Sequence, residues 1–169
     1  MTPPVEYQQA REQWRAFLED VRNACQFSTT NQAYTTAQGV FQTFRRRLAL
    51  ADAVRFATVL PGLLRALFVA EWDPEEPRRP FAAPDVLLEE ARQLRPNHNF
   101  TPEGAIAHVA WAVRRRVEPA PFARVLAALP AEAGAFWQVN GDASERQADA
   151  WRAVRAAESR PITRTGDDS

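Results

Sequence analysis

Apolar residues recur along this chain at the three- and four-residue spacing of amphipathic α-helices. The first stripe falls within residues 7–24, where charged residues occupy the other faces. Its members are Trp14, Phe17, Leu18 and Val21. Comparable stripes predict helices over about residues 31–49, 52–60 and 62–71. The pattern therefore predicts an all-α fold.

Polar residues and prolines indicate where these helices begin. Residues 28–31 supply side-chain oxygens that can cap the second helix, and Asp52 is the predicted N-cap of the third, with Val54 facing inward. Pro61 has no backbone N–H to donate and disfavours helical geometry in the residue before it. We therefore expect a fourth helix to begin directly after Pro61, with Leu63 among its core-facing residues.

The second half of the chain follows the same plan. Three prolines between residues 72 and 80 predict a linker. Beyond it, caps and prolines predict helix starts near Asp85, Thr101, Pro119 and Pro130. The first of these helices is expected to bury Val86 with its apolar stripe.

The two halves match each other at one fixed offset of 69 residues. Arg45 corresponds to Arg114 (114 − 45 = 69) and Pro61 to Pro130 (130 − 61 = 69). Nine of the 33 positions in residues 36–68 are identical in residues 105–137, without a gap. We interpret this as an internal duplication. It predicts two tandem four-helix repeats, packed as a compact helical bundle or short solenoid, plus a C-terminal accessory helix. The predicted boundaries are 1–74 for the first repeat, 75–80 for a proline-rich linker, 81–139 for the second repeat, 140–159 for the accessory helix and 160–169 for a disordered tail.

Four motifs of the chain resemble a known family. They are Trp14-x-x-Phe17-Leu18-x-x-Val21, Arg46-x-Leu48, Leu60-Pro61-x-x-Leu64-Arg65-x-Leu67-Phe68 and Trp72-Asp73-Pro74. Over about residues 7–139 the chain resembles the bacterial family named domain of unknown function 2267. The second copy departs from the motif at residues 132–134 and has no matching Trp-Asp-Pro. The resemblance implies an all-helical fold, and since the family's function is not established, it carries over no catalytic residue.

Charge and composition narrow the range of partners. All 21 basic residues are arginine and are balanced by 21 acidic residues. The chain therefore lacks the strong positive field that is typical of nucleic-acid-binding proteins. Abundant alanine and the absence of lysine indicate a GC-rich bacterial source. With one cysteine, Cys25, no membrane-spanning stretch and no signal peptide, we expect a cytoplasmic protein with a reduced thiol.

Both halves carry an arginine triplet at the predicted end of their second helix. The triplets are Arg45, Arg46 and Arg47 in the first half and Arg114, Arg115 and Arg116 in the second. One hypothesis is a pair of anion sites that bind phosphate or carboxylate. The other is that basic residues suit a helix C-terminus and leave the apolar stripe intact. We favour the second, because the net charge is zero and no aromatic residues are interleaved with the arginines.

Two tryptophans lie apart from the predicted core stripes. Trp111 falls on the opposite side of its helix from Val109 and Val113. It could anchor a partner protein, or pack between the two repeats, which is the interpretation we prefer. Trp72 follows the first repeat and is expected mainly to pin the linker, although it too is a candidate partner-binding residue.

The remaining polar residues form no recognisable catalytic or metal motif. His98 and His108 are ten positions apart, which matches no compact metal site, and both are expected to be exposed. The pairs Glu75-Glu76 and Glu89-Glu90 are expected on solvated faces, because no Glu-x-x-His pattern accompanies them. We therefore expect no catalytic residue, no cofactor and no metal.

These absences favour a non-enzymatic protein-interaction or regulatory module whose partner is another protein. The first alternative is a weak nucleic-acid or phosphate binder that uses the two arginine triplets. The second is a helical ligand carrier or enzyme with a pocket between the repeats. The sequence leaves the partner, the oligomeric state and the role of the C-terminal helix open.

Overall fold

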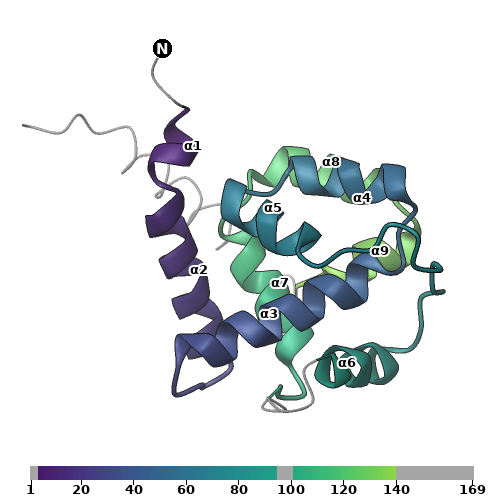
Figure 1. The fold of residues 1–169 in the computed structure, drawn as a ribbon, viewed down its shortest axis with the longest axis horizontal. Helices are drawn as coiled ribbons and strands as arrows, with labels where there is room; N and C mark the ends of the chain where they lie inside the picture. Colours follow the sequence, from purple (N-terminus) through teal and green to yellow (C-terminus); the bar gives the residue numbers. More distant parts are fainter. Residues whose placement is uncertain (1–3, 95–100, 140–169) are drawn as a thin grey trace, which may run out of the picture.

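A computed structural model describes residues 4–94 and 101–139 (Figure 1). All regular secondary structure in this part of the chain is α-helix. The helices of the first half are α1 (Val5–Gln8), α2 (Ala10–Ala24), α3 (Thr30–Arg45), α4 (Leu50–Thr58) and α5 (Gly62–Val69). Those of the second half are α6 (Pro84–Gln93), α7 (Ala105–Arg114), α8 (Pro119–Ala128) and α9 (Ala131–Phe136). The predicted all-α class is confirmed. The predicted accessory helix and tail, residues 140–169, lie outside the described part.

Several predicted helix starts are correct, and others are displaced by a few residues. Thr29 caps α3 in a capping box, in which its hydroxyl accepts from the Gln32 N–H at 3.3 Å. α5 begins directly after Pro61, as predicted. Asp52, however, is not an N-cap: α4 begins at Leu50, and Asp52 sits in its first turn, 2.7 Å from Arg55. The carboxylate still lies near the positive end of the helix, which is favourable without a capping bond.

Three residues that the stripes assign to the core are exposed. Val54, Leu63 and Val86 keep 53%, 39% and 51% of their surface accessible. Each lies on a helix of ten residues or fewer at the surface, where neighbours cover one side only. The apolar stripe is wider than the face that those neighbours bury.

The central element is α3, which is covered on every side. Every residue from Thr35 to Arg45 is buried, including Gln38, Gln42 and Thr43. α2, α5, α6 and α7 all pack against it. In Figure 1, α3 accordingly crosses the middle of the molecule, with α6 below it and α5 above it.

Helices of each half pack against helices of the other half, and the two halves share one core. α2 of the first half packs on α7, α6 of the second half packs on α3, and α4 lies beside α8 (Figure 1). Trp137, which is fully buried, lies with its ring centroid 5.6, 5.2 and 5.3 Å from those of Phe41, Phe44 and Phe56. A residue of the second half therefore forms the centre of an aromatic cluster in the first.

Helix bounds in the two halves recur at the sequence offset of 69. α4 and α8 begin at Leu50 and Pro119 (119 − 50 = 69), and α5 and α9 begin at Gly62 and Ala131 (131 − 62 = 69). This correspondence is what a duplication would produce, while the tandem-repeat arrangement and its domain boundaries stay predictions.

Gly39 marks the closest approach of α3 to α6. A Cβ added to Gly39 would lie 2.6 Å from the Ala91 carbonyl oxygen, a backbone atom that cannot move alone. We expect Gly39→Ala to destabilise the protein by about 1–3 kcal/mol, because forced separation of the helices outweighs the gain in helix propensity. Gly134→Ala is the matched control: its Cβ would meet nothing within 4 Å, so a gain of about 0.5–1 kcal/mol is expected. Urea unfolding of both variants measures the change in the free energy of unfolding, which should be negative for Gly39→Ala and positive for Gly134→Ala. Equal changes in the two variants would contradict the packing argument.

Among the helices that the structure describes, none has the length and apolar character needed to cross a membrane.

Candidate interaction surface

The first arginine of each triplet donates hydrogen bonds to backbone carbonyls inside the protein. Arg45 donates from Nη1 to the Phe68 carbonyl at 2.6 Å and to the Ala70 carbonyl at 3.0 Å. Arg114 donates from Nε to the Trp137 carbonyl at 2.7 Å. Both arginines thus hold the last turn of the final helix in their own half, where backbone carbonyls lack helical partners. The two acceptors lie at equivalent positions (137 − 68 = 69).

The third arginine of each triplet reaches a helix of the other half. Arg47 Nη2 lies 2.6 Å from Glu90 Oε2 on α6, and Arg116 Nη2 lies 2.6 Å from Asp20 Oδ2 on α2. The middle arginines join the same carboxylates, with Arg46 3.4 Å from Glu90. Arg115 Nε correspondingly lies 3.3 Å from Asp20 Oδ2. These ion pairs connect the two halves across the shared core.

Burial and charge shift the protonation equilibria of this network. Burial lowers the pKa of Arg45 to about 10, which still leaves the guanidinium charged at neutral pH. Burial by itself would raise the pKa of Glu90. The hydrogen bond and positive charge of Arg47, together with the charge of Arg79, outweigh burial and hold that pKa below its usual value. Glu90 is therefore an ionised member of the network, and the expectation that it lies on a solvated face is wrong.

The network leaves no arginine of either triplet without an internal contact. Besides Arg47 and Arg116, the middle residues Arg46 and Arg115 are engaged by carboxylates. Binding a phosphate here would require breaking ion pairs that link α3 to α6 or α7 to α2. The geometry supports the structural interpretation of the triplets.

Both candidate partner-binding tryptophans are half-buried and contact arginines. The Arg45 guanidinium lies 5.2 Å from the Trp72 ring centroid, and that of Arg115 lies 4.8 Å from the Trp111 ring centroid. Both rings also pack against the core. Trp72 and Trp111 thus make packing contacts within the protein, and the binding of a partner by either stays a prediction.

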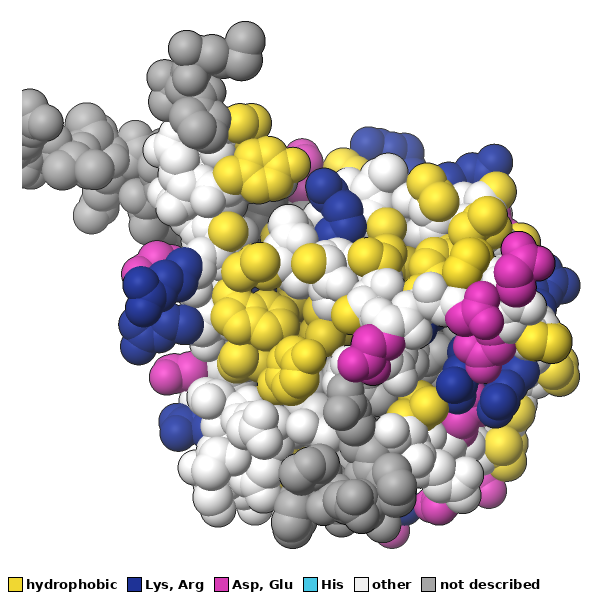
Figure 2. All heavy atoms as spheres, in the orientation of Figure 1, with side chains coloured by type: hydrophobic (Ala, Val, Ile, Leu, Met, Phe, Trp, Pro, Cys, Tyr) yellow, Lys and Arg dark blue, Asp and Glu magenta, His cyan; other side chains and the backbone are white. Residues whose placement is uncertain are grey.

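A different set of aromatic and aliphatic residues forms an apolar part of the surface. We name it the aromatic patch and define it as Tyr7, Trp14, Tyr34 and Leu63, from α1, α2, α3 and α5. Tyr7 is 52% exposed and Leu63 is 39% exposed, while the Trp14 and Tyr34 rings meet edge to face at 6.1 Å. Figure 2 shows apolar side chains gathered on this face of the molecule. Exposed apolar groups of this kind are typical of protein-interaction sites.

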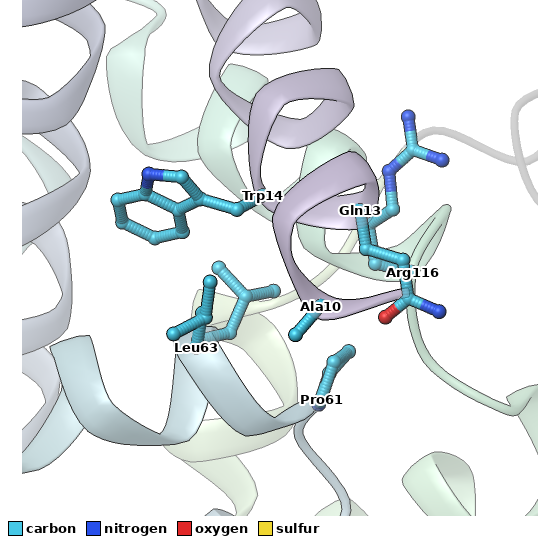
Figure 3. A pocket seen from close by; sticks show the side chains of 7 residues that line it. Ala10, Gln13, Trp14, Pro61, Leu63 and Arg116 are labelled. Carbon is cyan, nitrogen blue, oxygen red and sulfur yellow. The ribbon is translucent and has the colours of Figure 1, made fainter. Parts of the chain in front are cut away.

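Within the patch, the side chains are closely packed. The Trp14 indole lies against Leu63, with Ala10 and Pro61 beside them (Figure 3). Gln13 and Arg116 lie on the other side of α2 from the Trp14 ring (Figure 3). The hollow between these residues has a volume of only about 10 Å³, about the space of one water molecule. The patch is therefore a nearly filled surface rather than a pocket for a small molecule.

Comparison with known proteins identifies the family. The model of a family described as an uncharacterized conserved protein (DUF2267) matches residues 14–136. The chain belongs to this family. A comparison with curated proteins gives no match. Family membership therefore agrees with the resemblance found in the sequence motifs, and it brings no assigned activity to this member of DUF2267.

The other candidate residues of this DUF2267 chain form no cluster. His108 is half-buried rather than exposed and lies over Gly104, while His98 lies outside the described part. Within residues 4–94 and 101–139, no group of three His, Cys, Asp or Glu side chains could hold a metal ion. Burial raises the pKa of Cys25 to about 11, so the thiol stays protonated and poorly nucleophilic.

The aromatic patch of this family member does not stand out in the sequence. Trp14 and Leu63 belong to regular apolar stripes, which predict burial, and only the positions of α1 and α5 leave them at the surface. One signal was present at the offset of 69: Leu63 corresponds to Glu132 in the second half. A position that accepts a carboxylate in one copy is typical of a surface.

Proposed function

We propose that this DUF2267 protein is a non-enzymatic interaction module whose aromatic patch binds an apolar segment of a partner protein. The cluster of the exposed Tyr7 and Leu63 with the half-buried Trp14 is the observation that carries the proposal. Aromatic residues dominate the energetics of protein interfaces, because they bury a large area at a small cost in side-chain entropy. The proposal places this function in the cytoplasm, where the Cys25 thiol would stay reduced.

The filled surface of the patch favours a macromolecular partner over a small ligand. A hollow of about 10 Å³ cannot enclose a metabolite, for which sites are typically at least about 300 Å³. A partner helix or loop, in contrast, can cover the flat faces of Trp14 and Tyr34 and displace water from Tyr7. The partner surface is expected to be apolar at its centre, since the four residues that define the patch are uncharged and Arg116 lies beside it.

The test uses Leu63→Glu combined with Tyr7→Ser in the full-length tagged protein. Glutamate is the residue at the equivalent position 132, so the fold has a precedent for it. We expect a stoichiometric partner to be captured from source cells by the wild type, after nuclease treatment, and to be lost by the variant. With the purified partner, calorimetry should show affinity reduced by about tenfold or more, or about 1.4 kcal/mol.

Val54→Glu is the matched control, because Val54 is a 53% exposed apolar residue on α4, outside the patch. It should bind the partner like the wild type. Equal loss of binding in both variants, or capture that disappears with nuclease, would contradict the proposal and direct attention to the arginine triplets.

A further inference from the structure

A second apolar surface lies on the second half of the molecule and has the size of a binding groove. It opens between α6, the start of α7 and α9, with a volume of about 380 Å³. Its larger apolar lining residues include Phe81, Leu87, Leu88, Ile106 and Phe136. Two exposed carboxylates, Glu103 and Glu132, are the charged groups on its border. We name it the α6–α9 groove.

Beside α9, the second half has small residues where the first half has an indole and a leucine. In the first half, α2 packs directly on α5, and Trp14 lies beside Leu63 and Leu64. The buried residues of α2 and α6 correspond at an offset of 70, as Phe17 to Leu87 and Val21 to Ala91 show, so Pro84 takes the place of Trp14. At the offset of 69, Ala133 takes the place of Leu64. α6 packs on α3, and the groove lies between α6 and α9.

We propose that residues 142–159 of this same chain bind in the α6–α9 groove, with Trp151 as the side chain that fills it. The segment repeats its apolar residues at helical spacing, with Ala150, Trp151, Val154 and Ala157 on one side. Trp151 has the largest of these side chains, and its indole can bury a large apolar area in the groove.

Chain connectivity places the segment at the groove. Gln138 lines the groove, and Val139, the next residue, packs against the core. Trp151 follows 12 residues later (151 − 139 = 12), a length that can span about 40 Å when extended. The segment can therefore reach any part of the groove, and a short tether gives it an effective concentration in the millimolar range. A free peptide would need high affinity to compete with it.

The charges next to Trp151 are opposite to those on the border of the groove, while residues 142–159 as a whole carry four acidic and three basic residues. Arg152 and Arg155 lie next to Trp151 and Val154 in the segment, while the border of the groove carries Glu103 and Glu132. Opposite charges around an apolar contact contribute little affinity at an exposed site but select the orientation of the bound segment. The inference is independent of the partner proposed for the aromatic patch, which lies on other helices.

Photo-crosslinking in the full-length protein tests the contact directly. Trp151→benzoylphenylalanine retains a large aromatic side chain and should crosslink within the same molecule to peptides that contain residues 103–107 or 132–138. The same probe in place of Ile162, outside the apolar stripe, should not. Crosslinks to other peptides, or to a second molecule in proportion to protein concentration, would overturn the inference.

Trp151→Ala provides a second measurement that does not depend on crosslinking chemistry. Loss of the indole should accelerate amide hydrogen exchange in α6 and α9 by about tenfold, while α4 and α8 remain unchanged. The variant should also bind Nile red, which requires an open apolar groove, whereas the wild type should not. Equal dye binding by both proteins would show that the wild-type groove is open and that the segment does not occupy it. Ile162→Ala is the control for both readouts.

Discussion

Replacement of Trp137 by alanine is expected to lower the free energy of unfolding by about 3–5 kcal/mol. Trp137 is completely buried, and its ring contacts Phe41, Phe44 and Phe56 of the other half at centroid distances of 5.2–5.6 Å. The substitution removes these contacts and leaves a cavity where the two halves meet, a place with no flexible loop that could collapse into it. Urea unfolding followed by far-UV circular dichroism measures the loss.

Trp137→Phe separates the packing of the ring from the polarity of the indole. Phe68 occupies the equivalent position in the first half (137 − 68 = 69), so a phenyl ring fits this helix position. The indole Nε1 of Trp137 is buried and has no hydrogen-bond partner among the described residues. Removing that unsatisfied donor recovers about 1–3 kcal/mol of the lost packing energy. The phenylalanine variant should therefore be much less destabilised than the alanine variant, and equal destabilisation of the two would contradict this account.

Replacement of Glu90 by glutamine is expected to destabilise the protein by about 3 kcal/mol at neutral pH. Glu90 pairs with Arg47, whose side chain is only 3% exposed, and Arg46 and Arg79 are also within 3.4 Å of its Oε1. Without the carboxylate, three guanidinium groups would face each other with no counter-charge from α6. Glu89→Gln is the control, since Glu89 is the adjacent residue and its side chain is 56% exposed. Its effect should stay within about 0.5 kcal/mol.

The effect of Glu90→Gln should disappear in acid. The folded protein holds the pKa of Glu90 below its usual value, so the carboxylate stabilises the fold above the unfolded-state pKa of about 4.3. This contribution is lost as the pH falls through the lower, folded-state pKa. The difference in stability between wild type and variant should be complete near pH 7 and shrink below about pH 4. A difference that does not change with pH would show that the loss arises from packing and not from charge.

The sequence predicted helix starts well where they depend on interactions within one helical turn. A side-chain cap within residues 28–31 and the start of α5 after Pro61 were predicted correctly, because a cap and a proline act within one helical turn. Asp52 was assigned as an N-cap although the helix begins at Leu50, since an acidic residue suits several positions of a first turn equally well. Helix starts predicted from such a broad preference therefore differ from the observed starts by a few residues.

The arginine triplets could be found in the sequence, but their contacts could not. Their identity in both halves was clear from the sequence, and the lack of interleaved aromatic residues there argued against a binding site. In the structure, Trp111 lies against Arg115 from one turn earlier in the same helix, whereas Trp72 and Phe122 lie under Arg45 and Arg114 from other segments. Contacts between separate segments leave no spacing pattern that a single sequence could reveal.

The sequence by itself determined the helical class, the family motifs and the correspondence of the two halves at the offset of 69, because periodicity and identity are properties of the chain alone. Only the tertiary structure decided which apolar residues are buried. Trp14 and Leu63 follow the same helical spacing as Phe17 and Leu64, yet one pair contributes to the surface and the other to the core. The reason is that burial depends on which helices lie alongside, and here α2 and α6 each pack across onto the other half.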